Sequence, residues 1–303
     1  MLAVLPNVAG LARGQPTGGA VNQFVGDLVC MGCHGELSAE FRENPHHDPS
    51  APDQPAGRAG CESCHGMGAL HAISADTSKI GGFTASPPSE AIDRCLVCHG
   101  GDFGKMHIRR SAHTTSDVGC VSCHSIHAAH PEGQLLAGLE REVCYRCHAN
   151  IRARFEMPFK HRVNEGAIAC SDCHNPHGAP LATWASAHSP RMVSHGMGND
   201  QPCLGCHADV AGPFVFEHPP LRVEGCAACH DPHGSTNPRL LARPAVFVMC
   251  LECHNEVDGF GPRSEGIIGP TPGFHNLSDP SFRECVLCHS RIHGSNADPL
   301  FRR

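Results

Sequence analysis

Ten copies of the pentapeptide C-x-x-C-H run through the chain, and together they contain all 20 of its cysteines. This pentapeptide is the attachment signature of c-type haem, because its two thiols add to the vinyl groups of one porphyrin and its histidine then lies beneath the iron. The cysteines expected to attach haem are Cys30, Cys33, Cys61, Cys64, Cys95, Cys98, Cys120, Cys123, Cys144, Cys147, Cys170, Cys173, Cys203, Cys206, Cys226, Cys229, Cys250, Cys253, Cys285 and Cys288. The histidines expected to be proximal ligands are His34, His65, His99, His124, His148, His174, His207, His230, His254 and His289.

Disulfides and zinc sites explain this pattern less well than haem does. A disulfide framework gives no reason for a histidine after every second cysteine, and a zinc ribbon is indifferent to the residue that follows C-x-x-C. The sequence therefore predicts ten covalently attached haem c groups. Such attachment belongs to exported proteins, and the cysteine density agrees with that compartment.

Fifteen further histidines are available for the sixth coordination position of each iron. Taken in successive pairs, the motifs define five modules, and each module has one histidine shortly before its second motif and one after it. We expect these ten to be distal ligands: His47, His113, His161, His218 and His275 before the motif, and His71, His127, His177, His233 and His293 after it. We expect surface or hydrogen-bonding roles for His46 (the alternative to His47), His107, His130, His188 and His195.

Methionine is the competing sixth ligand of c-type haem. None of the eight methionines recurs in register with the motifs, so we predict bis-histidine coordination throughout. After Cys250–His254 the expected nearby histidine is missing, and Gly259 and Phe260 follow instead. The distal ligands of the last two haems are therefore the least determined, with His275 the histidine that precedes Cys285.

The stretch CSDCHNPHG at residues 170–178 indicates how the modules connect. His177 follows His174 by three residues, a span of at most ~10 Å. A tether that short would have to pass around the porphyrin edge to reach the other face of the same haem. We therefore expect His177 to serve a different haem, and the same holds for His127, His233 and His293.

The rest of the chain is poor in the residues that build an ordinary core. Aromatic residues make up 5% of the 303 residues, against 33 Gly and 25 Pro. We predict a mostly irregular fold with short α-helices and almost no sheet: an elongated multihaem cytochrome of about five dihaem repeats around a haem chain. Because haem would replace the side-chain core, we expect the haem-free chain to be unfolded. Helices are expected over residues 30–41, 141–155 and 201–210, and loops over 44–60, 86–89 and 261–273.

The repeat also predicts the domain organisation. A poorly ordered segment, 1–25, is either the remnant of a secretory signal or a polar tail. A decahaem domain, 26–303, follows, with dihaem modules at about 26–80, 81–138, 139–182, 183–243 and 244–303. No apolar run reaches the ~20 residues of a membrane-spanning helix. The net charge of −7 argues against a nucleic-acid partner.

Several stretches resemble one known family: CESCHGMGALH, CVSCHSIH, CSDCHNPHG, GPFVFEHPP, GCAACHDPHGS and CVLCHSRIHGSN. They are similar to the MtrA/DmsE-type decahaem cytochromes, the periplasmic subunits of outer-membrane porin–cytochrome conduits. The resemblance extends from about Cys30 to the C-terminus. It implies a periplasmic protein partly inserted into an outer-membrane β-barrel porin. The implied partners are a periplasmic or inner-membrane cytochrome donor and an extracellular multihaem cytochrome or terminal reductase.

Three functions are compatible with ten haems. A conduit between periplasm and cell exterior, for extracellular respiration or iron oxidation, needs only electron exchange and so suits irons with both axial positions filled. An extracellular cytochrome filament would use the same wiring. A nitrite- or hydroxylamine-type oxidoreductase needs an open iron position, whereas the spare histidines here outnumber the vacancies. We therefore expect an electron carrier with no catalytic residues.

Overall fold

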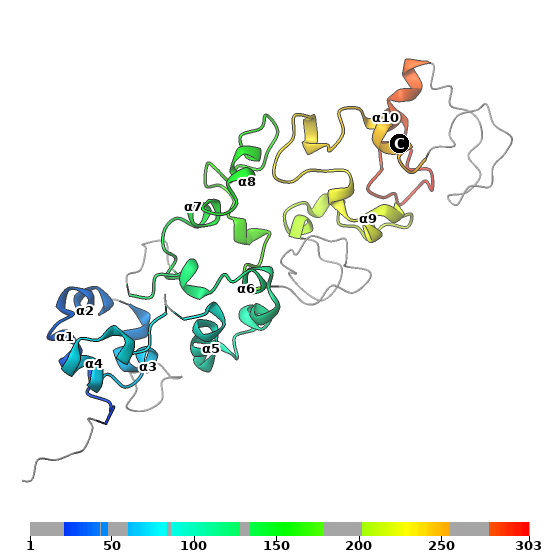
Figure 1. The fold of residues 1–303 in the computed structure, drawn as a ribbon. Helices are drawn as coiled ribbons and strands as arrows, with labels where there is room; N and C mark the ends of the chain where they lie inside the picture. Colours follow the sequence, from blue (N-terminus) through cyan, green and yellow to red (C-terminus); the bar gives the residue numbers. More distant parts are fainter. Residues whose placement is uncertain are drawn as a thin grey trace, which may run out of the picture. The chain divides into compact units, whose positions relative to one another are not determined.

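Short helices joined by irregular stretches make up the computed structural model (Figure 1). The structure describes residues 21–42, 44–47, 60–83, 86–127, 134–178, 202–254 and 279–302. The α-helices are α1 Asp27–Met31, α2 Gly35–Phe41, α3 Cys61–His65, α4 Ala69–Ser74, α5 Pro88–His99, α6 Ala112–Thr115, α7 Glu140–Tyr145, α8 Ala149–Arg154, α9 Pro219–Val223, α10 Val246–Leu251 and α11 Cys285–Cys288. The 3-10 turns are Pro45–His47, Thr77–Lys79, Phe103–Lys105, Ile108–Arg110, Cys120–Ser122, Cys170–Asp172, Pro202–Gly205, Ala208–Val210, Cys226–Ala228, Pro238–Leu240 and Pro280–Arg283.

Strand pairing is nearly missing from this architecture. The described residues form only isolated antiparallel bridges, namely His124–Leu136, Phe159–Ser235, Phe216–Ser295 and His230–Leu241. The predicted class, mostly irregular with short helices and almost no sheet, is thereby confirmed. The abundance of glycine and proline accounts for it, since both residues interrupt helices and strands.

Two of the three expected helices are interrupted at a motif histidine. The helix expected over 30–41 is split into α1 and α2, and the one expected over 141–155 into α7 and α8. The breaks fall at His34 (φ −107°, ψ 42°) and His148 (φ −100°, ψ 44°), both in non-helical conformations. The third, expected over 201–210, is two 3-10 turns, Pro202–Gly205 and Ala208–Val210.

One of the three expected loops overlaps a helix, and the other two lie partly or wholly outside the described residues. Residues 86–89 were expected to be a loop, but α5 begins at Pro88. Proline at the first position of a helix is a start signal, because its missing N–H has no intrahelical partner there anyway. The described part of the 44–60 loop contains one 3-10 turn, and residues 48–59 and 261–273 lie outside the described residues.

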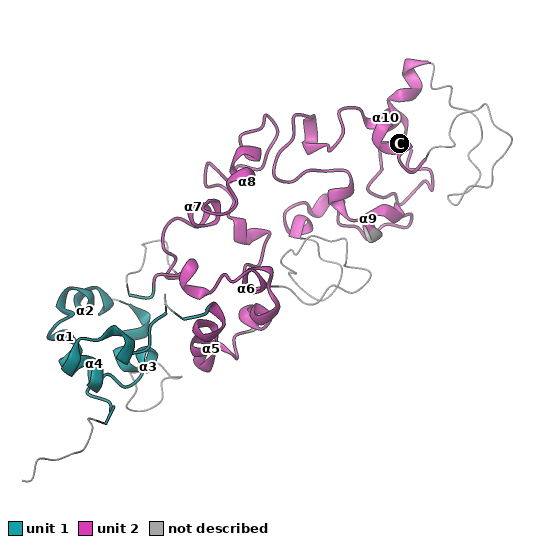
Figure 2. Ribbon diagram, in the orientation of Figure 1, with its two compact units in different colours: residues 1–87, 126–128 teal, residues 88–125, 129–303 magenta. Residues whose placement is uncertain are grey.

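The chain divides into two compact units, coloured separately in Figure 2. Unit 1 comprises Met1–Pro87 and Ile126–Ala128; unit 2 comprises Pro88–Ser125 and Ala129–Arg303. The short segment Ile126–Ala128 is thus separated in sequence from the rest of its unit. It contains His127, which the sequence predicts to be a ligand for a haem other than that of its own motif.

Few apolar side chains are buried. Among the described residues they are Ala69, Ala91, Ile92, Leu135, Val143, Tyr145, Phe155 and Val163. Three of these form one cluster, in which Tyr145 packs with Phe155 and Val163. The Tyr145 hydroxyl donates to Asn164 Oδ1 at 2.7 Å, which satisfies the one polar atom of that ring. Side chains alone therefore supply a small core for a chain of this length.

No helix in the described ranges has the length and apolar character needed to cross a bilayer.

Candidate haem-binding sites

Each C-x-x-C-H motif folds as one helical turn. The backbone N–H of the motif histidine donates to the carbonyl of the first cysteine, at 2.9 Å from His34 to Cys30 and 3.0 Å from His148 to Cys144. A single turn places both thiols and the imidazole on neighbouring faces of the same short segment. All twenty cysteines lie within described residues, and none of them is in a disulfide. The thiols are thus placed for thioether attachment.

Within the part of the chain that the structure describes, eight motif histidines are seen with a second imidazole facing them. The ring centroids lie 5.8 to 6.3 Å apart in the pairs His34–His71, His65–His127, His148–His113, His124–His177, His207–His161, His174–His233, His254–His218 and His230–His293. Every second member is a histidine that the sequence predicts as a distal ligand. The structure therefore brings eight of the ten predicted distal ligands against a motif histidine.

The spacing within these pairs fits a metal ion between the rings. A metal–imidazole bond measures about 2.0–2.1 Å, so two such bonds in line, with about 1 Å from each nitrogen to its ring centroid, span roughly 6 Å. Direct stacking of two rings would bring them closer than this. The donor set and the gap together suit a haem iron with two axial histidines.

The other nitrogen of many of these rings is occupied. The Nδ1 atoms of His65, His71, His113, His124, His161, His230 and His289 each donate to a backbone carbonyl, at 2.6 to 3.1 Å. A carbonyl only accepts, so the proton resides on Nδ1 and the lone pair on Nε2 is left for a metal. This is the usual outer-shell arrangement of metal-binding histidines.

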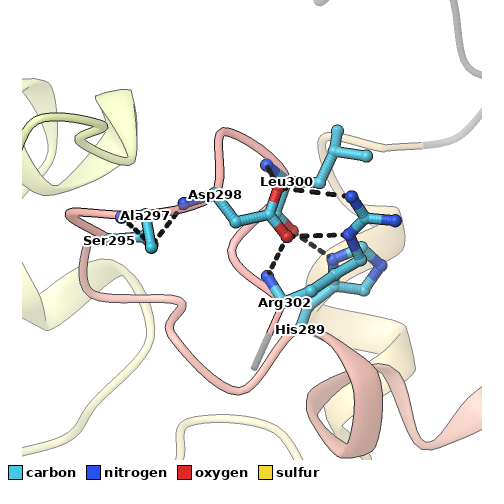
Figure 3. A network of polar contacts seen from close by, with 6 residues as sticks. All are labelled: His289, Ser295, Ala297, Asp298, Leu300 and Arg302. Atoms are coloured by element: carbon cyan, nitrogen blue, oxygen red, sulfur yellow. Dashed lines mark hydrogen bonds and ion pairs between the residues drawn. The ribbon is translucent and has the colours of Figure 1, made fainter.

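Figure 3 shows how the chain holds one such carbonyl in place. His289 Nδ1 donates to the Leu300 carbonyl at 2.6 Å. The Asp298 carboxylate accepts from the Leu300 N–H at 3.0 Å and from Arg302 Nε at 2.7 Å, so the turn is fixed on both sides of that carbonyl. The Arg302 guanidinium holds the pKa of Asp298 below its usual value, and the carboxylate stays charged. Ser295 Oγ accepts from the Asp298 N–H at 3.0 Å.

Five of the facing histidines have lowered pKa values. Burial lowers the pKa of His127, His177, His218 and His293, and that of His233 to about 4; in each case the facing motif histidine lowers it further. Neutral imidazole is the form that binds a metal, because the protonated ring has no free lone pair. These sites therefore favour the ligating form at neutral pH.

The glycine after three of these histidines permits a close backbone approach. Gly178, Gly234 and Gly294 all have positive φ, at +99°, +148° and +146°. A Cβ at Gly178 would lie 2.8 Å from the His107 carbonyl oxygen; at Gly234 it would meet the Arg154 carbonyl. The N-P-H-G, D-P-H-G and I-H-G stretches therefore require glycine both for conformation and for space.

Antiparallel bridges next to Gly234 and Gly294 hold these backbone segments against the chain that they contact. Ser235 exchanges two backbone hydrogen bonds with Phe159, at 2.8 and 3.2 Å. Ser295 makes the same exchange with Phe216, at 2.9 and 2.8 Å. In both cases the ligand-bearing turn of one module is attached to the chain of the preceding module.

Sequence reasoning missed the residues that build the site in unit 1. Glu62, at a variable position within its motif, is buried, and its carboxylate accepts from the N–H groups of Val25, Gly26 and Gly68 at 2.7 to 3.1 Å. Asp27 Oδ1 accepts from the Cys61 N–H at 3.0 Å. The pKa of the Cys61 thiol is raised to about 12, mainly by burial and further by the negative charge of Asp27. The sequence alone does not indicate that a charged residue between the two cysteines of a motif is buried.

The remaining predicted residues lie as follows. His47 belongs to the Pro45–His47 turn, with its ring edge-on to Phe41 at 5.8 Å. Its alternative, His46, has Nδ1 3.1 Å from Asn44 Oδ1. His107 precedes the Ile108–Arg110 turn. His130, His188, His195 and His275 lie outside the described residues, as do Gly259 and Phe260.

Two family models match parts of the chain. The family model "Doubled CXXCH motif" matches residues 113–153 and 218–259, and the model "Cytochrome c554 and c-prime" matches residues 70–125. Among solved structures, the undecahaem cytochrome from the S-layer of Carboxydothermus ferrireducens is 20% identical with a TM-score of 0.23. That match covers 49% of this chain and 31% of the other.

A curated relative covers most of the chain. The multihaem cytochrome MtrA of Shewanella baltica (strain OS185) is 32% identical over 274 residues, which span 88% of this chain and 78% of the relative. This match shows that the chain is a haem c protein that transfers electrons rather than acting as an enzyme. The chain therefore belongs to the MtrA family of multihaem cytochromes.

Proposed function

We propose that the protein is an electron conduit with ten bis-histidine haem c groups, working between the periplasm and the cell exterior within an outer-membrane porin–cytochrome complex. The observation that supports it best is the set of eight facing imidazole pairs. Each pair joins a motif to a histidine from elsewhere in the chain, and each has a gap that suits one iron.

The pairs follow a regular order along the chain. The histidine after a module's second motif faces the second motif of the preceding module: His127 faces His65, His177 faces His124, His233 faces His174 and His293 faces His230. The histidine before a module's second motif faces the first motif of the following module: His113 faces His148, His161 faces His207 and His218 faces His254. Successive modules are thus interleaved by ligands in both directions.

The ends of the array need a different solution. In the first module, His71 faces His34 of the same module. We assign the two predicted ligands outside the eight pairs, His47 and His275, to the two motifs outside them, 95–99 and 285–289. With this assignment every iron has two histidines.

The chain's own residues then have three tasks. The thiols would hold each haem covalently and the paired imidazoles would ligate its iron, so that no substrate could bind there. The carbonyls at Nδ1 orient the imidazoles. Haem, when bound, supplies the one-electron redox chemistry, and the protein sets spacing and electrostatics.

The proposed location and partners rest on family membership. We place the chain in the periplasm, associated with the outer membrane through a β-barrel porin. Its donor would be a periplasmic or inner-membrane cytochrome, and its acceptor an extracellular multihaem cytochrome or terminal reductase. The interleaved ligands support this assignment, because a relay across a membrane needs an unbroken series of closely spaced haems.

Two measurements test the proposal. The intact mass of the purified holoprotein should equal the chain plus ten haem c, and its oxidised spectrum should be entirely low-spin. Liposomes that enclose a viologen dye should exchange electrons with an external reductant only when they contain both this protein and its porin. Electron exchange at the same rate without this protein would contradict the conduit, and a high-spin ferric signal would favour an enzyme.

A further inference from the structure

Two of the eight histidine pairs differ from the other six in the angle between their rings. The planes of His113 and His148 are inclined by 61°, as are those of His161 and His207. The other six pairs are inclined by 11° to 25°. Both crossed pairs involve a histidine that lies before a second motif and faces the following module.

A shared hydrogen bond distinguishes the crossed pairs. His113 Nδ1 donates to the Pro176 carbonyl at 2.9 Å, and His161 Nδ1 donates to the Pro232 carbonyl at 2.8 Å. Each proline directly precedes another predicted ligand, His177 or His233. One carbonyl therefore lies between the distal ligands of two haems in successive modules.

The C-terminal module provides a natural comparison. His218 occupies the position equivalent to His113 and His161, and its ring is inclined by only 11° to His254. Within the described residues its ring makes no hydrogen bond to a carbonyl and instead meets Phe301 edge-on at 5.5 Å. Arg291-Ile292 stands there in place of Asn175-Pro176 and Asp231-Pro232.

The side chain of the residue before each proline makes a hydrogen bond that orients the proline carbonyl. Asn175 Oδ1 accepts from the His177 N–H at 3.0 Å, and Asp231 Oδ1 accepts from the His233 N–H at 3.3 Å. Arginine cannot accept such a bond. The turn itself is common to all three modules, since Gly178, Gly234 and Gly294 each donate to the residue three before, at 2.9 to 3.2 Å. The difference therefore lies in the dipeptide, not in the turn.

We infer that Asn175-Pro176 and Asp231-Pro232 are positioning residues that hold the distal imidazoles of motifs 144–148 and 203–207 crossed against their proximal partners. This rests on the bis-histidine ligation proposed above. Parallel imidazoles interact with the same iron d orbital, whereas crossed imidazoles interact with two and bring their energies together. These two haems are therefore electronically unlike the other six, and each stands at a junction between modules. Second-shell hydrogen bonds are a known means by which proteins tune haem.

Electron paramagnetic resonance of the oxidised holoprotein tests this inference, because nearly degenerate d orbitals give a ferric signal with an unusually large maximum g value. The double variant Asn175→Arg/Pro176→Ile should lose one haem per chain from that signal, while the 203–207 haem serves as an internal reference. The converse variant, Arg291→Asn/Ile292→Pro, should add one. Unchanged spin counts in both variants, with ten haems retained, would overturn the inference.

His113→Ala separates this outcome from a failure of the ligation itself. If His113 is a ligand, this variant turns one low-spin haem high-spin and removes one large-g signal. If instead every haem stays low-spin, His113 is not a ligand, and the proposed ligation fails together with the inference.

Discussion

The first module and the modules after it are held together in different ways. In the first module, His71 on α4 faces His34 of the same module. In the later modules, His177, His233 and His293 face motifs of the module before their own. The difference teaches that the histidine after a second motif can face either its own module or the module before it.

The sequence around these histidines reflects the difference. Ala72 follows His71 and continues α4, with its N–H donating to Gly68 at 2.9 Å. A glycine with positive φ follows each of the three later histidines, because its backbone lies against the preceding module. Glycine thus follows three of the four histidines that face the preceding module, whereas the fourth, His127, which faces His65, is followed by alanine.

The largest effects on haem spin state and stability should come from replacing one histidine that faces its own module and one that faces the preceding module. These two variants test the comparison directly. His71→Ala and His233→Ala should each turn one low-spin haem into a high-spin one. Only His233→Ala should also loosen a junction, lowering the free energy of unfolding by at least about 3 kcal/mol and exposing the chain between modules to protease. Spectroscopy with limited proteolysis measures both; equal protease sensitivity of the two variants would contradict the comparison.

Gly234→Ala should be the next most damaging change. The new Cβ would meet the Arg154 carbonyl in a backbone conformation that L-residues rarely adopt, at a cost of about 2–4 kcal/mol. Gly35→Ala is the matched control, because nothing lies within 4 Å of that position at the start of α2, and its effect should stay within about 1 kcal/mol. Denaturant unfolding followed by Soret circular dichroism compares the two.

Glu62→Gln should weaken the closed end of the array. The amide replaces a carboxylate that accepts three backbone N–H groups, and we expect a loss of about 2 kcal/mol. Cleavage near residues 21–27 should then become faster, since Glu62 holds Val25 and Gly26. Glu36→Gln, an exposed change in α2, should leave the cleavage rate as it is; if both variants behave alike, Glu62 has no special role.

The smallest expected effect is the dependence of folding stability on pH. The half-buried His233 has its pKa lowered to about 4, against about 6.5 in an unfolded chain, and the proposed iron ligation would oppose its protonation further, so the unfolded state binds the proton first. Stability should be constant above pH 6.5 and fall as pH drops toward 4, with His127, His177, His218 and His293 acting in the same direction. Thermal unfolding across this range measures it; a midpoint that rises on acidification would contradict the sign.

The pairing of histidine rings seen in the structure agrees with the sequence-based set of candidate ligands, because the motif chemistry is local. A C-x-x-C-H motif needs only one helical turn, so its ten positions follow from spacing alone. The recurrence of two spare histidines per module gave the set of candidates for the distal position. The tether from His174 to His177 also indicated that a ligand serves another module, because that argument depends only on chain length.

Other features depend on contacts that spacing does not encode. The break between α7 and α8 occurs because His148 leaves the helical conformation at the motif's end. The start of α5 at Pro88 could have been predicted from the proline itself, which was interpreted as a loop residue. The burial of Glu62 and the partner of each distal histidine arise from long-range packing, which a single sequence does not show.

The pairing of histidines between successive modules has a consequence for biogenesis under the proposed ligation. A polypeptide is made from its N-terminus, so in the proposed ligation His65 would wait for His127, and His124 for His177, until the whole next module has been made. A chain that stops early at any such boundary leaves its last porphyrin open to dioxygen and peroxide. Complete translation is then a safeguard against oxidative damage as well as a condition for conductance.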